Sequence, residues 1–211
     1  MHDFIELAAV IASAVYGVIL ARRHGMDFVG VFCLSFVVAF GGGTLRDLLL
    51  DRHPMFWIRE HHYPVIVFSI ALGMSLLPHV PKRVESLLQV PDALGLGLFT
   101  VAGTAAAVEE GTSMFVAALL GAVTGTFGGV IGDVIVNRVP SLFRPAPLFA
   151  TCSFSGAWVF LFLDAAPATR SLAPAIATAV VVGFRLASIR WNWSLPNIEE
   201  DGSDSSNKGD S

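Results

Sequence analysis

The stretch "GGTLRDLLLDRHP", from Gly42 to Pro54, recurs later in the chain as "GGVIGDVIVNRVP", from Gly128 to Pro140. Both glycines of the first copy, its aspartate, its second arginine and its proline have a counterpart 86 residues further on. The matched charges are Asp47 with Asp133 and Arg52 with Arg138, and the same offset extends back to Gly25 with Gly111 and to Gly17 with Gly103. The sequence therefore predicts two copies of one structural unit.

Both copies lie in a strongly apolar chain. Of its 211 residues, 54% are hydrophobic and only 14% are charged, and the mean hydropathy is +0.68. Soluble domains contain about 25% charged residues, so we expect an integral membrane protein with no nucleic-acid partner. A transmembrane helix needs about 20 apolar residues, and seven stretches are candidates: Phe4–Ala21, Phe28–Leu50, Tyr63–Leu77, Ala93–Val108, Met114–Val136, Leu148–Leu163 and Leu172–Ile189.

The predicted fold is all-α, with seven transmembrane helices. Residues 1–88 form the first three-helix unit, residues 89–168 form the second, and residues 169–193 contain the seventh helix. The polar and acidic residues 194–211 form a disordered cytoplasmic tail. Because each unit has an odd number of spans, the second copy enters the membrane from the opposite side, which produces an inverted repeat of the kind found in many transporters.

The distribution of basic residues predicts the orientation in the membrane. The loops after spans 1, 3 and 5, together with the C-terminus, hold eight Lys and Arg residues, whereas the opposite side holds three. Basic residues are concentrated in cytoplasmic loops. We therefore expect an inner (plasma) membrane protein with its N-terminus outside and its C-terminus in the cytoplasm.

Each copy of the motif contains a glycine pair in the middle of an apolar span, Gly42 with Gly43 and Gly128 with Gly129. Glycine leaves helical geometry more easily than other residues, so we predict that both helices are interrupted there. The backbone groups released by such a break cannot be satisfied by lipid and must face protein or a water-filled cavity. The two breaks together predict a hydrated constriction between the second and fifth spans.

Charged residues follow both glycine pairs. Asp47 and Asp133 come four residues after the second glycine, in the predicted first turn of the second half-helix, where the helix dipole favours a carboxylate. Arg46 has no counterpart, because Gly132 takes its place. We expect Arg46 to lie between the two aspartates, which leaves a net charge of −1 that favours a small monovalent cation. Two hydroxyls before the second glycine pair are further pore candidates: Thr124 and Thr126.

A second interpretation of the same residues is that the glycines only allow helices to pack closely and that the charges lie at the membrane interface. Arg185, near the end of the last span, is expected to extend its side chain to that interface. The six histidines lack the spacing of a helical metal site, so no bound metal or cofactor is predicted.

The duplicated motifs, the seven spans and the predicted orientation resemble the prokaryotic branch of the trimeric intracellular cation channel (TRIC) family. The resemblance implies a homotrimer in which each subunit has its own pore for monovalent cations, chiefly potassium, between bent second and fifth helices. The kinks would fall on Gly42, Gly43, Gly128 and Gly129, and the polar pore groups would be Arg46, Asp47 and Asp133. Animal members carry a lysine-rich lipid-binding motif, whereas the matching region here, Gly103–Ser113, has no lysine. Membrane lipids are expected as surroundings, without regulation through that motif.

Two other functions fit parts of this pattern. A secondary transporter for a small solute such as glycine would use the same inverted repeats and broken helices, with the carboxylates binding a coupling ion or an ammonium group. An aspartyl intramembrane protease would use two aspartates that share a proton. The protease requires a Gly-x-Gly-Asp stretch, and Val130 stands at the position of its first glycine. We therefore expect that the protein is not an enzyme.

Overall fold

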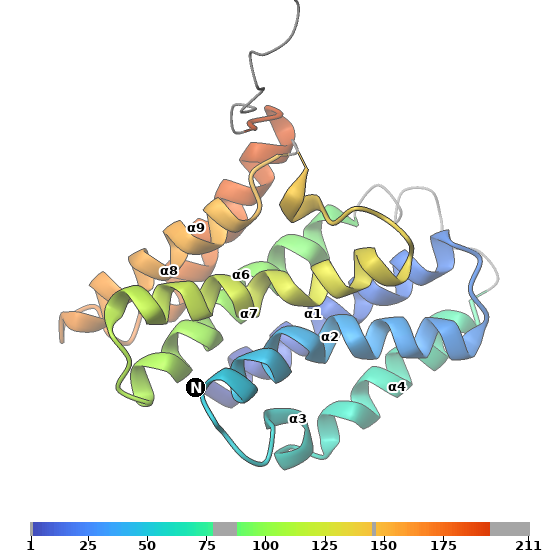
Figure 1. Ribbon diagram of the computed structural model, residues 1–211, viewed down its shortest axis with the longest axis horizontal. Coiled ribbons are helices and arrows are strands. Elements are labelled where there is room, and N and C mark those ends of the chain that lie inside the picture. Colours follow the sequence, from blue (N-terminus) through green and yellow to red (C-terminus); the bar gives the residue numbers. More distant parts are fainter. Residues whose placement is uncertain (1, 78–87, 145–146, 195–211) are drawn as a thin grey trace, which may run out of the picture.

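The computed structural model describes residues 2–77, 88–144 and 147–194. These residues form eight α helices and one short 3-10 helix, η1 (Ser141–Phe143), and they contain no strand (Figure 1). The predicted all-α class is therefore confirmed for the described part of the chain. The predicted tail, residues 194–211, lies outside the described residues except at its first position.

Seven of the helices occupy the seven predicted apolar stretches. Five of them are long and apolar enough to cross a membrane, whereas α4 and α8 are shorter apolar helices. The eighth helix is the short α3 (Phe56–Arg59), which the hydropathy pattern does not reveal. The bounds of the seven are α1 (His2–Arg23), α2 (Phe28–Leu49), α4 (His62–Ser75), α6 (Gln89–Glu109), α7 (Met114–Ile135), α8 (Ala150–Ala165) and α9 (Ala173–Arg190).

Helices α2 and α7 are built alike at both ends. A side-chain oxygen caps the start of each, because Asp27 accepts from the Gly30 amide at 2.8 Å and Ser113 accepts from the Val116 amide at 3.4 Å. Each helix is followed by a residue in the left-handed region, which Asp and Asn tolerate better than most residues: Asp51 with φ 53° and Asn137 with φ 56°. The duplication seen in the sequence thus extends to the local backbone.

Four helices form the centre of the molecule. α1 packs on α2, α2 on α7, α7 on α6, and α6 on α1, so the four make a ring (Figure 1). α4 packs on α1 and α2, whereas α8 and α9 pack on the α6 and α7 side. Most buried residues are small or apolar, yet five charged residues are also at most 8% exposed: Glu6, Arg46, Asp47, Asp133 and Arg185. These charges identify the candidate site.

Candidate functional site

Gly42 and Gly128 lie where α2 and α7 cross. A Cβ atom at Gly42 would overlap the carbonyl oxygen of Thr124, and a Cβ atom at Gly128 would overlap that of Val38. Each glycine therefore lets the backbone of the other helix approach, as small residues do in membrane helix pairs. The residue numbers run in opposite directions across this contact, so α2 and α7 are antiparallel (Figure 1).

The predicted interruption of these helices is wrong. Helix geometry continues through both glycine pairs, from Phe28 to Leu49 and from Met114 to Ile135. An unbroken helix keeps its backbone hydrogen bonds satisfied in lipid. The missing side chains serve packing instead, because Gly43 faces the Phe56 ring, just as Gly42 and Gly128 face backbone. An added Cβ at Gly129 would lie at an ordinary 3.7 Å from the Phe149 ring.

Arg46 is buried between two carboxylates at one end of the ring, which we call the Glu6 end. Its Nη1 donates to Glu6 Oε1 at 2.9 Å, and its Nε donates to Asp47 Oδ1 at 2.8 Å. The other Asp47 oxygen accepts the backbone N–H of Phe56 at 2.7 Å. Arg46 is only 1% exposed, so its guanidinium is buried within the protein. Such a cation is stable only because it is paired and hydrogen-bonded, and the three charges sum to −1.

Asp133 lies away from this cluster, so the expectation that Arg46 lies between Asp47 and Asp133 is wrong. Gly132, next to Asp133, packs against Val38 of α2. Val38 and Asp47 are nine residues apart, which is about 13 Å along a helix axis. Asp133 Oδ2 instead accepts from the backbone N–H and the hydroxyl of Ser141, at 3.0 and 3.3 Å. The antiparallel arrangement carries the two aspartates to opposite ends of the ring.

A second buried ion pair lies at the end where Asp133 is found, which we call the Asp92 end. Arg185 Nη2 of α9 lies 3.5 Å from Asp92 Oδ2 of α6. Arg185 Nη1 donates to the carbonyls of Pro147 and Leu148, at 2.9 Å each, and the guanidinium carbon lies 4.6 Å from the centre of the Phe149 ring. Arg185 is 8% exposed, so its side chain is buried against these partners within the protein.

Sequence reasoning missed Glu6 and Asp92, although a signal was present. The two acids are 86 residues apart, the same offset that relates the motifs. Each occurs near the start of the first helix of its repeat, where a single charge in an apolar window looks like part of a loop. Their partners could be found only from the tertiary structure, because Arg185 belongs to neither repeat.

Two cavities lie next to the buried ion pairs. The cavity at the Glu6 end has a volume of about 170 Å³, and its walls include Glu6, Arg52, Arg59, Ala102 and Ala106. The cavity at the Asp92 end is about 20 Å³, enough for about one water molecule. Its walls include Ser13, Tyr16, Asp92, Thr124, Gly128, Gly129 and Phe149. The two cavities share no lining residue, and the second ends at the crossing of α2 and α7.

The predicted pore hydroxyls both bond back to their own helix. Thr124 Oγ1 donates to the Leu120 carbonyl at 2.6 Å, and Thr126 Oγ1 donates to the Ala122 carbonyl at 2.7 Å. Thr124 lines the smaller cavity, whereas Thr126 lines neither of the two. The structure thus brings Thr124, Gly128 and Gly129 together at one cavity and places the cluster of Arg46 and Asp47 at the other end.

Comparison with known proteins agrees with this architecture. A family model described as "Glycine transporter" matches twice, to residues 3–79 and to residues 89–165. The two matches begin 86 residues apart, which is the offset of the motifs. A UPF0126 membrane protein of Vibrio cholerae is 37% identical over 198 residues, covering 92% of this chain and 81% of the relative. The UPF0126 inner membrane protein YadS of Escherichia coli K12 is 31% identical over 202 residues, covering 94% and 96%.

Solved structures with the same fold are cation channels. The TRIC trimeric intracellular cation channel orthologue from Rhodobacter sphaeroides is 32% identical with a TM-score of 0.84, and the match covers 91% of this chain and 98% of that one. A TRIC cation channel studied for its conductance is 27% identical with a TM-score of 0.84, covering 95% and 98%. The apolar helices and these relatives together make this chain a multi-pass membrane protein. It belongs to the UPF0126 family and to the prokaryotic branch of the TRIC family.

Proposed function

We propose that the protein is a channel for monovalent cations, chiefly potassium, and that each subunit of a homotrimer conducts through its own ring of α1, α2, α6 and α7. The solved relatives are described as cation channels, and one of them as trimeric. The buried charges among the described residues lie on three of these helices, α1, α2 and α7, and on α9, which supplies Arg185. The fourth helix of the ring, α6, contributes the partly buried Asp92. A charge inside a membrane segment usually marks an ion or substrate pathway.

The observation that carries this proposal is the pair of carboxylate clusters at opposite ends of one ring. Glu6 lines the cavity at one end and Asp92 lines the cavity at the other. A carboxylate at the wall of a narrow cavity with low-dielectric surroundings concentrates cations there. The crossing at Gly42 and Gly128 lies between the two clusters and is closely packed. We infer that the structure represents a closed pathway with its constriction at this crossing.

The same arrangement supports the inverted repeat. The two family-model matches and the antiparallel α2 and α7 are what two three-helix units of opposite orientation would produce. We propose that α4 and α8 also cross the membrane, for a total of seven spans. The Glu6 end, which contains the start of α1, would then face the outside, and the Asp92 end would face the cytoplasm.

Single-channel recording tests the proposal directly. Purified protein in a planar bilayer, with a KCl gradient across it, should show unitary currents that reverse close to the equilibrium potential of potassium. Reversal close to the chloride potential, or the absence of unitary current from correctly assembled protein, would contradict the proposal.

A charge substitution tests the position of the pathway. Asp133 lies one helical turn beyond Gly129, on the face of α7 that lines the smaller cavity. We expect Asp133→Asn to lower the unitary conductance or the preference for potassium over chloride. Asp201→Asn, in the acidic C-terminal segment, should change neither. Equal effects of both substitutions would count against a pathway beside α7.

A secondary transporter of a small solute such as glycine is the second candidate, because the matching family model carries that name. A transporter binds its solute and turns over far more slowly than a channel conducts. Uptake of radiolabelled glycine into proteoliposomes, without unitary currents, would favour the transporter. The solved relatives are channels and not enzymes, so we propose no chemical reaction.

A further inference from the structure

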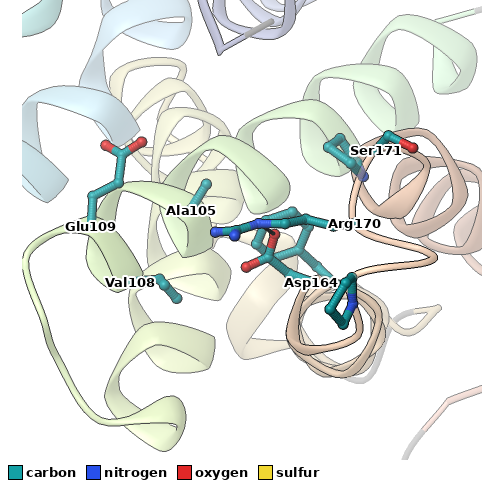
Figure 2. Close-up of a pocket in the computed structure, with 9 residues that line it drawn as sticks. Ala105, Val108, Glu109, Asp164, Arg170 and Ser171 are labelled. Atoms are coloured by element: carbon teal, nitrogen blue, oxygen red, sulfur yellow. Dashed lines mark hydrogen bonds and ion pairs between the residues drawn. The ribbon is translucent and has the colours of Figure 1, made fainter.

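A third and larger cavity opens beside the Glu6 end. Its volume is about 410 Å³, and it lies between the end of α6, the end of α8 and the start of α9 (Figure 2). Its charged side chains are Glu109, Asp164 and Arg170, and Arg170 Nε donates to Asp164 Oδ1 at 3.2 Å. The other walls are mostly apolar, and they include Ala105, Val108, Phe160 and Pro174. We call this space the lateral cavity.

The lateral cavity adjoins the cavity that contains Glu6. Four residues line both spaces: Ala105, Glu109, Phe160 and Pro174. Three of the four are small or apolar, so Glu109 is the one shared residue that carries a charge. Figure 2 shows the Glu109 side chain at the α6 edge of the lateral cavity, with Arg170 and Asp164 across from it.

The neighbouring Glu110 is a matched control for substitution of Glu109. Glu110 has the same charge and a similar side-chain exposure, 43% against 50% for Glu109. Both acids lie near the same arginine, since Arg52 Nη2 is 3.8 Å from Glu109 and Arg52 Nε is 3.4 Å from Glu110. Glu110 lines neither of the two cavities. The two residues therefore differ mainly in their position relative to the cavities.

We propose that the lateral cavity is a side entrance to the pathway and that Glu109, at its junction with the Glu6 cavity, is the carboxylate that concentrates cations there. This inference rests on the proposed channel function. Cations would enter between α6, α8 and α9 and pass Glu109 before they reach Glu6. The ion pair of Asp164 with Arg170 contributes no net charge, whereas Arg52 is shared by Glu109 and Glu110, so these three side chains carry a net charge of −1 beside the entrance.

The salt dependence of the conductance gives the first test. The Debye length is about 10 Å in 0.1 M salt and about 3 Å in 1 M salt, so a vestibule charge acts mainly in dilute solution. We expect Glu109→Gln to lower the unitary potassium conductance about twofold near 0.1 M KCl and to have little effect near 1 M. Glu110→Gln should lower the conductance less near 0.1 M KCl, because Glu110 lines neither cavity, and should have little effect near 1 M.

Thiol labelling gives a test of the entrance itself. In a background of Cys33→Ser and Cys152→Ser, Val108→Cys places a thiol in the lateral cavity only, and Val139→Cys places one at an exposed position near the Asp92 end. A cationic methanethiosulfonate reagent should lower the current through Val108→Cys, because it adds bulk and positive charge at the entrance. The same reagent should leave the current through Val139→Cys unchanged.

Unitary current does not depend on how many channels fold, so a variant that assembles poorly still reports the property tested. Equal conductance losses in Glu109→Gln and Glu110→Gln, or none in either, would overturn the inference. A current through Val108→Cys that the reagent leaves unchanged, although mass spectrometry confirms labelling of the thiol, would also overturn the inference. Absence of cation current in the unmodified protein would instead overturn the proposed function.

Discussion

The two repeats share the helix caps and the left-handed residues at the ends of α2 and α7, but the acid near the start of each repeat is paired with an arginine from a different place. Glu6 in the first repeat corresponds by the 86-residue offset to Asp92 in the second. Glu6 is paired with Arg46 of its own repeat, whereas Asp92 is paired with Arg185 of α9, which lies outside both repeats. Each arginine also lies over an aromatic ring, Phe56 in one case and Phe149 in the other.

The reason for this difference is visible at Gly132, which takes the place of Arg46 in the second repeat. An added Cβ at Gly132 would lie 2.8 Å from a methyl group of Val38, so α2 leaves no room for a longer side chain. The positive charge beside Asp92 comes from α9 instead, as Arg185. The comparison teaches that α9 completes the second repeat and is more than an addition to the fold.

Substitution in the cluster of Glu6, Arg46 and Asp47 should cause the largest loss of stability. Arg46→Gln leaves Glu6 and Asp47 buried without their cation, which typically costs about 3–5 kcal/mol of stability. Denaturant or thermal unfolding in detergent measures the loss. Arg59→Gln, at a side chain that is 46% exposed and 3.8 Å from Glu60, should stay within about 0.5 kcal/mol of the parent. A loss below about 1 kcal/mol for Arg46→Gln would show that the two carboxylates are stabilised without it.

The pair of Asp92 with Arg185 should contribute less to stability, and its contribution should be separable from that of the neighbouring hydrogen bonds. Arg185→Gln removes one ion pair and two hydrogen bonds to carbonyls, and we expect a loss of about 2–3 kcal/mol. Adding Asp92→Asn should recover part of this loss, because no uncompensated carboxylate is then left buried. The same unfolding measurement, arranged as a double-mutant cycle, reports the coupling. Additive losses would mean that Arg185 acts through the carbonyls of Pro147 and Leu148 alone.

The glycine crossing should respond equally from both repeats. Gly42→Ala and Gly128→Ala each push a methyl group into the backbone of the other helix, and we expect each to cost about 1–2 kcal/mol. Gly73→Ala in α4 meets no atom within 4 Å and should be neutral or slightly stabilising. The melting temperatures of the three variants measure these differences in stability. A harmless Gly128→Ala would show that the helices can separate at the crossing without loss of stability.

The smallest effect concerns the turns after α2 and α7. Asp133 accepts from the hydroxyl of Ser141 as well as from its backbone N–H, whereas Asp47 receives one backbone N–H at the matching turn, from Phe56. Ser141 corresponds by offset to Met55, which has no hydroxyl. Ser141→Ala makes the second turn resemble the first and should cost about 0.5 kcal/mol in the same assay. A much larger loss would show that the hydroxyl has a role that the backbone bond does not share.

Hydropathy was sufficient to predict where seven of the described helices lie, but not the short α3. The expected stretches Phe28–Leu50 and Met114–Val136 differ from α2 and α7 by one residue, because each helix has a polar cap at its start and a left-handed residue after its end. The expected break at the glycines was wrong because a glycine pair has the same sequence whether it interrupts a helix or allows a neighbouring helix to approach. Only the partner helix decides between the two, and the partner cannot be read from local sequence.

The charged site was only partly predictable for a related reason. Asp47 and Asp133 stood out because a motif repeats around them, whereas Glu6 and Asp92 match only in charge. The separation of the aspartates follows from the antiparallel packing of α2 and α7, which is a property of the assembled helices. Arg185 could be assigned to Asp92 only once α9 was placed against α6.

The crossing at Gly42 and Gly128 has a consequence for how such a passage would open. Its contact joins one main chain to another, so no side chain there can swing aside within the picoseconds to nanoseconds of a rotamer change. Widening it requires two whole helices to shift, and collective movements of this kind take microseconds to milliseconds. A current through this protein would accordingly switch between discrete, long-lived levels and would show little rapid flicker.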